Sequence, residues 1–231
     1  MKVSFLIPVY NEAATVGEVI EKVLTLPFET ELIVVDDGST DGSGEIVTEL
    51  AANNDAVRLV RQQNRGKGAA LRAGIPLISG DVAVIQDADL EYDPADVPAL
   101  IEPILLGRAD VVYGSRLSGG RPQRAYLFWH RFGNRFLSLV TGLLYNTTLS
   151  DMETGYKAFR ADVLKSLDLR EDDFAIEPEI TAHICLRHLR IYELPISYYG
   201  RTYAEGKKIT WRDGIKALRV LVRLRIQHIR P

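Results

Sequence analysis

The sequence predicts an α/β fold built on a doubly wound, mostly parallel sheet, followed by a C-terminal amphipathic helix. Short β-rich runs alternate with helical patterns through residues 1–114. Runs such as 32–35 (LIVV) are continuously apolar, which suits parallel strands that are covered on both faces. The polar motifs follow the ends of these runs, where ligands bind in such sheets.

The first half of the chain supplies a regular alternation of elements. We expect strands at residues 3–9, 31–36, 57–61 and 82–86, and the regular pattern loosens after residues 110–114. We expect the intervening helices at residues 12–26, 42–53 and 68–78. Strand and helix in this order favour right-handed crossovers between parallel strands.

The second half is less regular. An Arg/Gly/Pro-rich loop at 115–124 leads into an amphipathic segment at 126–145, and the polar run 151–160 follows. A helix around 178–188, a strand near 191–195 and a basic helix at 211–229 complete the chain. We expect a single domain over 1–231, with a nucleotide-sugar half at 1–114, an acceptor half at 115–210 and the helix at 211–231.

Bulk composition narrows the class of protein. With 231 residues, 46% hydrophobic and 26% charged, the chain is typical of a globular domain. Its net charge of −3 gives no overall reason to expect nucleic-acid binding. Cys185 is the only cysteine, so no intrachain disulfide can form and a reducing compartment is expected. We expect no signal peptide and no membrane-spanning helix, because no apolar run is long enough.

The segment after strand 82–86 is the candidate metal site. Asp87 and Asp89 stand at positions i and i+2, so in extended chain they share a face about 6 to 7 Å apart. Glu91 adds an oxygen donor on that side if the extended run continues. Such carboxylates bind Mg²⁺ or Mn²⁺ when diphosphate oxygens complete the coordination shell. A solvated acidic turn is the alternative, and the strand-end position favours the metal.

Two further polar motifs follow strands. Asp36 and Asp37 end one strand and can accept from ribose hydroxyls or a base N–H, while Asp41 is expected to cap the next helix. A plain turn is the alternative, and a calcium loop fails because its twelfth position is Thr48. The run 64–68 (NRGKG) does not match a P-loop, but its glycine-rich helix start can hold a diphosphate.

Together the motifs IPVYNE, VVDDGSTDGS, NRGKGAALRAG and QDADLEYDP resemble the family 2 glycosyltransferases of the GT-A, Rossmann-like fold. Gly114-Ser115-Arg116, the pair Arg131 and Asn134, and the run DMETGYKAFR are similar to dolichyl- and polyprenyl-phosphate sugar synthases. The resemblance covers nearly the whole chain.

The resemblance implies a role for each candidate residue. The nucleoside pocket would be lined by Pro8, Tyr10, Glu12 and Asp37, with Asp36 beside it. Lys67 and Asp87 would approach the diphosphate, and Arg201 and Lys208 would close over it. Asp89 and Glu91 would bind the metal, and Arg116 and Arg131 would hold the acceptor phosphate.

The expected function is inverting transfer of a hexose from GDP-mannose or UDP-glucose to polyprenyl or dolichyl phosphate. A lipid phosphate is already ionised and needs no general base, and paired arginines suit it. The alternative is transfer to a soluble hydroxyl acceptor, for which Asp151, Glu177 or Glu179 could be the base. For Asp151 a capping role is equally plausible, and Arg131 could simply snorkel to the surface. A third class is a nucleotide-sugar-binding protein without turnover, which intact carboxylates at positions 87, 89 and 91 disfavour.

The basic C-terminal helix bears on location. One of its faces is apolar and consists of Ile215, Leu218, Val222, Ile226 and Ile229. Another face is basic and consists of Arg212, Lys216, Arg219, Arg223 and Arg230. Such a helix suits anionic lipid headgroups, or its apolar stripe packs on the domain and the arginines are solvated. The expected location is therefore peripheral, on the cytoplasmic face of a membrane, with a membrane-protein partner as a further possibility.

Overall fold

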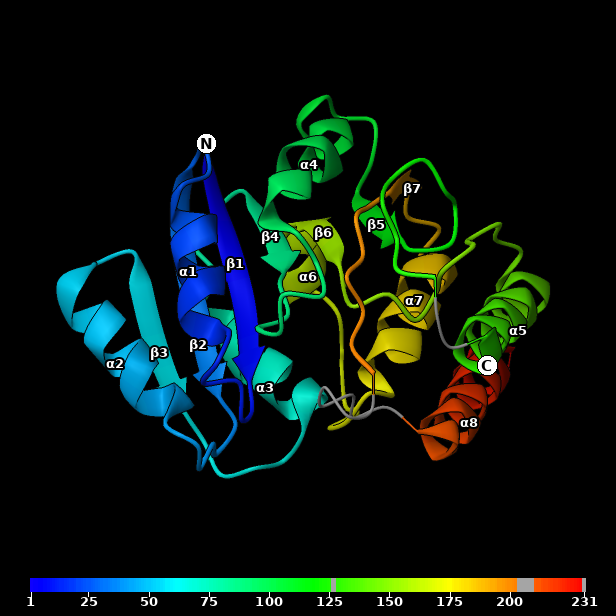
Figure 1. The fold of residues 1–231 in the computed structure, drawn as a ribbon. Helices are drawn as coiled ribbons and strands as arrows, with labels where there is room; N and C mark the ends of the chain where they lie inside the picture. Colours follow the sequence, from blue (N-terminus) through cyan, green and yellow to red (C-terminus); the bar gives the residue numbers. More distant parts are fainter. Residues whose placement is uncertain (126–127, 203–209, 230–231) are drawn as a thin grey trace.

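A computed structural model describes residues 1–125, 128–202 and 210–229. In this part of the chain the strands form one sheet of order β3-β2-β1-β4-β6-β5-β7 (Figure 1). The strands are β1 (Lys2–Val9), β2 (Glu29–Asp36), β3 (Val57–Arg61), β4 (Val82–Ile85), β5 (Val111–Ser115), β6 (Lys157–Arg160) and β7 (Ile191–Pro195). Only β6 runs antiparallel to its neighbours among these strands, so the mostly parallel sheet is confirmed.

Helices cover both faces of the sheet. One face carries α1 (Val16–Leu24), α2 (Ser43–Asn53) and α4 (Val97–Leu105), and the other carries α3 (Lys67–Gly74), α6 (Ala161–Lys165) and α7 (Ile176–Leu186). Alternate residues of β1 divide between the two layers, because Phe5 and Ile7 pack in the first and Leu6 in the second. The central strands are therefore apolar on both sides, as the continuous run at 32–35 predicts.

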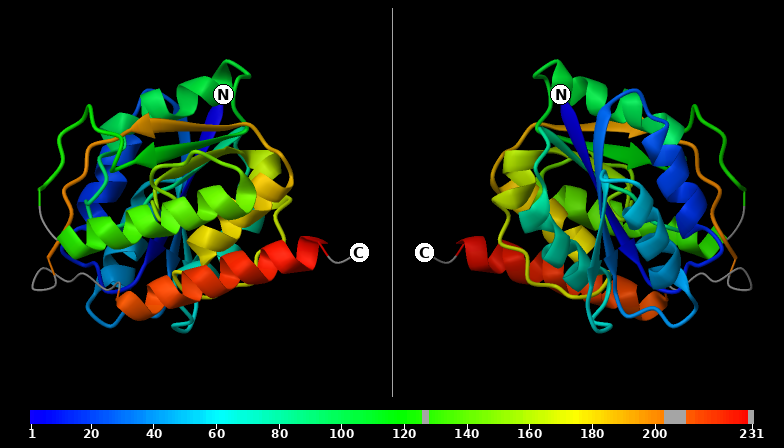
Figure 2. Two further views of the ribbon diagram at one scale, coloured as in Figure 1. Left: turned by 90° about the vertical axis from the view of Figure 1, so that its right-hand side faces the viewer. Right: turned by 90° about the vertical axis from the view of Figure 1, so that its left-hand side faces the viewer.

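Two long helices lie outside α7. The helices α5 (Phe128–Tyr145) and α8 (Trp211–Ile229) run side by side there, as two views agree (Figures 1 and 2). Leu137 and Tyr145 of α5 pack with Ala217 and Leu221 of α8. The Tyr145 hydroxyl also donates to the Leu221 carbonyl at 2.6 Å. This pair adds a layer beyond the three-layered sheet sandwich.

Element boundaries differ from the sequence predictions where local chemistry intervenes. The first helix begins at Val16, not at 12, because residues 12–15 form a turn in which Thr15 N donates to the Glu12 carbonyl. The predicted helix 68–78 ends at Gly74 and continues as a 3₁₀ turn, Ile75–Leu77, since Pro76 lacks an N–H. A second 3₁₀ turn, Pro94–Asp96, precedes α4.

The sequence patterns did not assign three elements. The helices α4 and α6 and the antiparallel strand β6 lie in stretches for which no element was expected. The strand β6 has only four residues, of which the first three are buried, so it shows no alternation that would reveal a strand. By contrast, β3, β7 and α8 have the predicted bounds.

Candidate functional site

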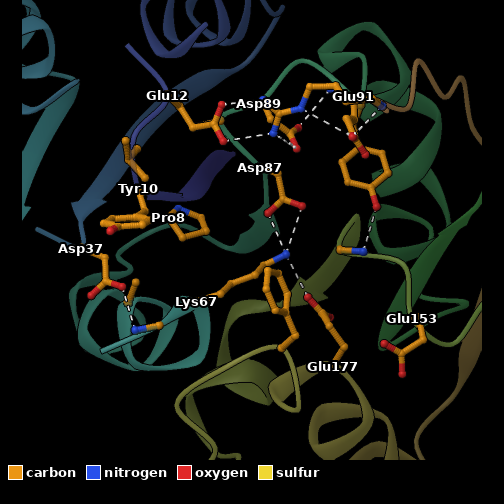
Figure 3. A pocket seen from close by; sticks show the side chains of 18 of the residues that line it. Pro8, Tyr10, Glu12, Asp37, Lys67, Asp87, Asp89, Glu91, Glu153 and Glu177 are labelled. Atoms are coloured by element: carbon orange, nitrogen blue, oxygen red, sulfur yellow. Dashed lines mark hydrogen bonds and ion pairs between the residues drawn. The ribbon is translucent and has the colours of Figure 1, made fainter. Parts of the chain in front are cut away.

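A cavity of about 390 Å³ opens at the carboxyl ends of β1 and β4. Ligands bind at this place in doubly wound sheets, where crossovers diverge to opposite faces. The cavity brings together most of the predicted site residues, namely Pro8, Tyr10, Glu12, Asp37, Lys67, Asp87, Asp89, Glu91, Arg116 and Arg201 (Figure 3). Asp36, Arg131 and Asp151 do not line it, and Lys208 lies outside the described residues.

Asp37 organises one end of the cavity. Its carboxylate accepts from the backbone N–H groups of Arg65 (2.9 Å) and Gly66 (2.7 Å) and from the Gln62 side chain (2.7 Å). Gly66 adopts φ +106°, and a Cβ there would lie 2.5 Å from the Asp172 carbonyl oxygen, so only glycine fits. Asp37 thus fixes the loop that starts α3 while remaining at the edge of the cavity.

The neighbouring aspartates act on the backbone. Asp36 accepts from Ser39 N at 2.9 Å and lies behind the cavity wall. The expected cap by Asp41 is displaced by one residue, because Gly42 occupies the N-cap position with φ +98°. The Asp41 carboxylate instead accepts from the Ser43 and Ala13 N–H groups, at 3.0 and 2.9 Å. This contact ties the turn after β1 to the start of α2.

Lys67 lies at the centre of the cavity between two carboxylates. Its ammonium contacts Asp87 at 2.7 Å and Glu177 at 3.1 Å, and Glu177 also pairs with the fully buried Lys157. Burial lowers the pKa of Lys67, but Asp87 and Glu177 outweigh it and raise the pKa above the ordinary value. Lys67 therefore carries a fixed positive charge, held by α7 and β4, at the position expected for a diphosphate.

Arg201 lies among three carboxylates at the rim. Its guanidinium contacts Glu12 at 2.8 Å, Asp89 at 3.0 Å and Glu91 at 3.6 Å. The Glu91 carboxylate also accepts from Arg201 N (2.8 Å) and the Tyr198 hydroxyl (2.7 Å). Glu91 thus anchors the chain segment that carries Arg201 over the cavity.

The predicted extended geometry of residues 87–91 is wrong. The segment forms a turn in which Leu90 has φ +59° and Glu91 N donates to Asp89 at 3.0 Å. Side chains therefore do not alternate along it as in a strand, although Asp87, Asp89 and Glu91 all reach the cavity. The turn forms because the Asp89 carboxylate captures a backbone N–H two residues ahead.

The acidic turn fits a divalent cation only with oxygens from another molecule. Within the described ranges no three carboxylate, histidine or cysteine side chains are placed to hold a metal ion by themselves. Burial and the charges of Asp87 and Glu91 raise the pKa of Asp89, with Arg201 opposing them. A cation would relieve that repulsion, and hard carboxylate oxygens suit Mg²⁺ or Mn²⁺ when phosphate oxygens complete the shell.

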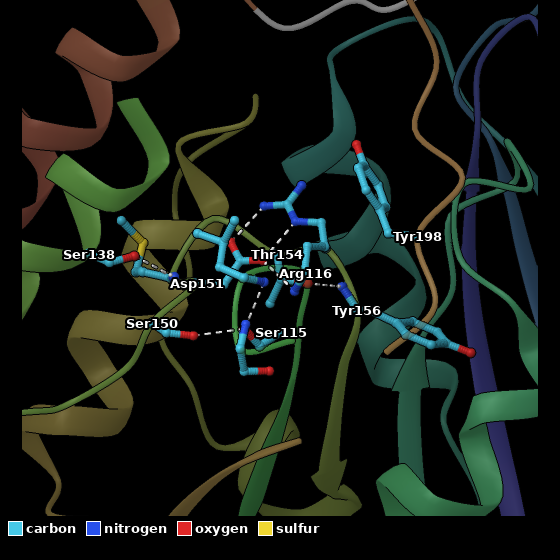
Figure 4. Close-up of polar contacts among 12 residues, drawn as sticks. Ser115, Arg116, Ser138, Ser150, Asp151, Thr154, Tyr156 and Tyr198 are labelled. Atoms are coloured by element: carbon cyan, nitrogen blue, oxygen red, sulfur yellow. Dashed lines mark hydrogen bonds and ion pairs between the residues drawn. The ribbon is translucent and has the colours of Figure 1, made fainter. Parts of the chain in front are cut away.

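Arg116 and Asp151 form a buried pair beside the cavity (Figure 4). The guanidinium makes two parallel hydrogen bonds to the carboxylate, both 2.7 Å, and Arg116 N adds a third at 2.9 Å. The Arg116 side chain is 10% exposed and that of Asp151 is 0%. The Arg116 guanidinium also lies over the Tyr198 ring, 5.3 Å from its centroid. Asp151 is therefore a partner that positions Arg116.

The predicted pairing of Arg116 with Arg131 does not occur within the cavity. Arg131 is exposed on α5, whereas Arg116 lines the cavity wall after β5. The sequence spacing could not reveal this, because the relative placement of α5 depends on its packing against α7 and α8. Arg131 lies instead on the exposed side of the molecule near a run of aromatic residues.

The carboxylates considered as general bases are already engaged. Asp151 pairs with Arg116, and Glu177 with Lys67 and Lys157. Glu179 accepts from the N–H groups of residues 170 and 171 and does not line the cavity. Each of these side chains thus has a structural partner that competes with proton abstraction.

Sequence reasoning missed several residues that line the cavity. Tyr92 stacks on Tyr156 with ring centroids 4.9 Å apart, and its hydroxyl accepts from Gly155 N at 3.0 Å. Tyr198 reaches the cavity from beyond β7 and bonds Glu91. Glu153 also lines the cavity, and its only sequence signal was its place within the DMETGYKAFR run.

The outer surface of α5 is strongly apolar. Six large side chains there are between 46% and 78% exposed, namely Phe128, Trp129, Phe132, Phe136, Leu139 and Leu143. Exposed patches of this kind are uncommon on monomeric proteins that do not bind another surface. None of the described helices is long and apolar enough to cross a membrane.

The structure shows how the expected apolar and basic faces of α8 are placed. It packs on its neighbours through Ala217, Val220 and Leu221, whereas Ile215, Val222, Ile226 and Ile229 of the predicted apolar stripe stay exposed. Of the five residues of that stripe only Leu218 contacts the core, so the expected packing of the stripe on the domain holds for this residue alone. Two of the basic residues are paired with the segment before α7, Lys216 with Asp173 and Arg223 with Glu171.

Comparison with known proteins places this site in a family. The sequence profile "Glycosyl transferase family 2" matches residues 4–168. An undecaprenyl-phosphate mannosyltransferase of Micrococcus luteus is 31% identical over 220 residues, which cover 90% of this chain and 87% of that protein.

Other relatives are longer than this chain. Glycosyltransferase AglJ of Haloferax volcanii is 30% identical over 200 residues, covering 86% of this chain and 63% of that protein. A dolichol-phosphate mannosyltransferase of Pyrococcus furiosus is 30% identical over 211 residues, covering 90% and 59%. The chain thus spans about three fifths of the length of these two relatives.

Solved structures share the fold. Glucosyl-3-phosphoglycerate synthase from Mycobacterium tuberculosis, in complex with Mn²⁺ and UDP-glucose, superposes with a TM-score of 0.75 at 22% identity. The similarity covers 100% of this chain and 80% of that one. A complex of the same synthase with Mg²⁺ and UDP has a TM-score of 0.71. The expected GT-A, Rossmann-like fold is confirmed.

Proposed function

The chain belongs to glycosyl transferase family 2, and we propose that it transfers a hexose from a nucleotide-sugar to polyprenyl phosphate with inversion. The observation that carries the proposal is that a molecule with this cavity also exposes a broad apolar surface on α5 and α8. A soluble acceptor gives no reason for such a surface, whereas a lipid acceptor requires the enzyme to reach a membrane.

A nucleotide-sugar donor would lie along the length of the cavity. Pro8, Tyr10 and Asp37 lie at one end, where an aromatic ring and a carboxylate can receive a nucleoside. Lys67 lies farther along and offers a positive charge to the diphosphate. We propose GDP-mannose or UDP-glucose as the donor, since two relatives are named mannosyltransferases and a solved structure of this fold contains UDP-glucose.

The leaving diphosphate needs its developing charge neutralised. A divalent metal held by Asp87 and Asp89 together with phosphate oxygens would supply Lewis-acid stabilisation of that charge. Lys67, which is paired with Asp87, and Arg201, which is paired with Asp89, would add fixed positive charges beside this metal. Both cations are tethered by buried acidic groups, so they are oriented before the donor arrives.

The acceptor chemistry follows from the engaged carboxylates. A phosphate oxygen is nucleophilic without loss of a proton, whereas a hydroxyl acceptor needs a base. Asp151 and Glu177 are both held in buried ion pairs, which disfavours the hydroxyl alternative that uses them. Arg116, fixed by Asp151 beside the cavity, can hold the acceptor phosphate next to the sugar.

The surface chemistry supports a peripheral location on an anionic membrane. The aromatic side chains of α5 suit the headgroup region, and the exposed Arg131, Arg212 and Arg219 suit anionic lipids. We propose the cytoplasmic face, where nucleotide-sugars are available. A membrane-protein partner would strengthen this attachment and is part of the same proposal.

The decisive experiment assays purified protein with Mn²⁺, GDP-mannose or UDP-glucose, and a short-chain polyprenyl phosphate. A lipid-extractable sugar phosphate of inverted anomeric configuration is the expected product. A product that remains in the aqueous phase when a saccharide is added, with no lipid product, contradicts the proposed acceptor. Chelation of divalent metal should stop the reaction, and re-addition of Mn²⁺ or Mg²⁺ should restore it.

A further inference from the structure

Glu153 is a carboxyl group in the cavity that no part of the proposed mechanism uses. It lines the cavity, and its Oε1 atom is buried without a hydrogen-bond partner. Other acidic residues around it are held, such as Asp87 by Lys67, Asp151 by Arg116 and Glu177 by two lysines. A buried polar atom without a partner is costly, so its presence in a binding cavity points to a ligand group.

The chain around Glu153 passes directly against the residues that face the diphosphate. A Cβ on Gly155 would lie 2.5 Å from Asp87 Oδ2 and 2.8 Å from Lys67 Nζ. Glycine therefore permits the segment 153–155 to approach this ion pair closely. The same segment is fixed by the bond from Gly155 N to the Tyr92 hydroxyl, so Glu153 has a defined position.

The order of groups along the cavity places Glu153 beyond the diphosphate. In Figure 3, Tyr10 and Asp37 lie on one side, Lys67 and Asp87 in the centre, and Glu153 on the opposite side. A nucleotide-sugar that lays its nucleoside at the first end and its diphosphate at the centre extends its sugar toward the third position. Glu153 thus lies where the donor changes from charged phosphate to neutral hydroxyl groups.

The charge state of Glu153 suits a hydroxyl partner. Burial, Glu177 and Asp151 raise its pKa while Lys157 and Arg116 lower it, and together they bring the pKa to about 8. At neutral pH the carboxyl therefore keeps its proton. A protonated carboxyl can both donate to and accept from a sugar hydroxyl, and it does not repel an incoming phosphate.

We propose that Glu153 recognises the transferred hexose by hydrogen bonding to its ring hydroxyls, and so contributes to donor sugar specificity. This role rests on the proposed function, because it requires a nucleotide-sugar in the cavity. It does not depend on the identity of the acceptor. Glu153 then acts on the sugar, while Lys67 and Arg201 act on the diphosphate.

The test compares the affinity for a nucleotide-sugar with that for its nucleoside diphosphate. Calorimetric titration with Mn²⁺ uses GDP-mannose against GDP and UDP-glucose against UDP. In Glu153→Ala we expect affinity for the accepted nucleotide-sugar to fall about tenfold, with affinity for the diphosphate unchanged. Glu153→Gln keeps a donor and an acceptor and should bind nearly as the wild type does, and Glu49→Ala on the surface of α2 is the control.

Deoxy analogues identify the hydroxyl. Removing the recognised hydroxyl from the sugar should weaken binding to the wild type about tenfold and leave binding to Glu153→Ala unchanged. The extra affinity contributed by the sugar should decline as pH rises past about 8 in the wild type, because the carboxyl loses its proton. Glu153→Gln should show no such decline.

The outcomes separate this proposal from the proposed function. Equal loss of nucleotide-sugar and nucleoside-diphosphate affinity in Glu153→Ala means a structural role and overturns the inference. Unchanged nucleotide-sugar affinity in Glu153→Ala also overturns the inference. So does a Glu153→Ala variant whose binding is weakened by each deoxy analogue as much as the wild type's is. Failure of the wild type to bind any nucleotide-sugar contradicts the proposed function itself and, with it, the role of Glu153.

Discussion

The cavity and the exposed apolar surface of α5 and α8 (the α5–α8 surface) differ in the kind of side chain that they present. In the cavity, charged side chains are buried and nearly all are held by a partner of opposite charge, as Lys67 is by Asp87 and Glu177. On the α5–α8 surface, large apolar side chains such as Trp129 and Phe132 are exposed and have no core to enter. The cavity is thus prepared for an anionic ligand, and the surface for an apolar one.

This contrast indicates where each kind of binding energy originates. Charged groups that are fixed before the ligand arrives would stabilise the proposed leaving diphosphate, because they need no reorganisation. Apolar side chains that are exposed before binding gain free energy only when they leave water. The first contribution favours reaction and the second favours localisation, so variants in the two regions should affect different measurements.

The largest expected effect concerns the buried pair of Arg116 and Asp151. Asp151→Ala leaves a nearly buried guanidinium without a partner and should lower the free energy of unfolding by about 3–5 kcal/mol. Urea denaturation followed by circular dichroism measures this. Asp168→Ala removes the exposed partner of Arg170 and should leave stability nearly unchanged. Equal losses in the two variants would show that burial does not determine the cost.

The next effect should fall on the reaction alone. Asp89→Asn removes a negative charge from the acidic turn but keeps an oxygen that can accept from Glu91 N, and it should reduce metal-dependent transfer about 10²–10³-fold, with little change in the thermal midpoint. The initial rate at several Mn²⁺ concentrations measures this, and Asp55→Ala, an exposed substitution, serves as the control. Unchanged activity would contradict the assignment of the metal site.

Substitutions of the exposed aromatic residues on α5 should affect only the binding of the protein to membranes. Replacing both Trp129 and Phe132 with alanine should lower partitioning onto anionic phospholipid vesicles about 10²-fold, since each ring contributes at least about 1.5 kcal/mol when fully buried. Sedimentation with vesicles measures the bound fraction. Leu106→Ala, which truncates an exposed leucine at the end of α4, should bind vesicles as the wild type does. Loss of nucleotide binding in the double variant would contradict the separation of the two regions.

The smallest expected effect concerns Arg131, which belongs to the surface and not to the cavity. Arg131→Ala should raise KM for polyprenyl phosphate about fivefold through loss of attraction to an anionic lipid surface, with donor affinity unchanged. Steady-state kinetics with the lipid varied at saturating donor measures this, and Arg108→Ala, exposed after α4, is the control. A fall in nucleotide affinity without a change in KM for the lipid would place Arg131 in the donor site.

Local patterns in the sequence determined the fold class and most of the cavity. Continuous apolar runs predicted the parallel strands because both faces of such a sheet are buried, and the acidic and glycine-rich motifs at their ends predicted the donor side. The helical spacing of Ile215, Val222, Ile226 and Ile229 predicted one apolar face of α8, because helical periodicity is a local property of the sequence.

Tertiary structure alone decided the other half of the site. The contacts of Arg201 with Glu12, of Lys67 with Glu177 and of Arg116 with Asp151 join residues far apart in the sequence. Only the fold showed that Arg131 stays outside the cavity and that Glu153 lines it with an Oε1 atom that has no hydrogen-bond partner. Residue type and spacing set which groups follow each strand, but burial and charge pairing depend on how separate elements pack, which no local pattern encodes.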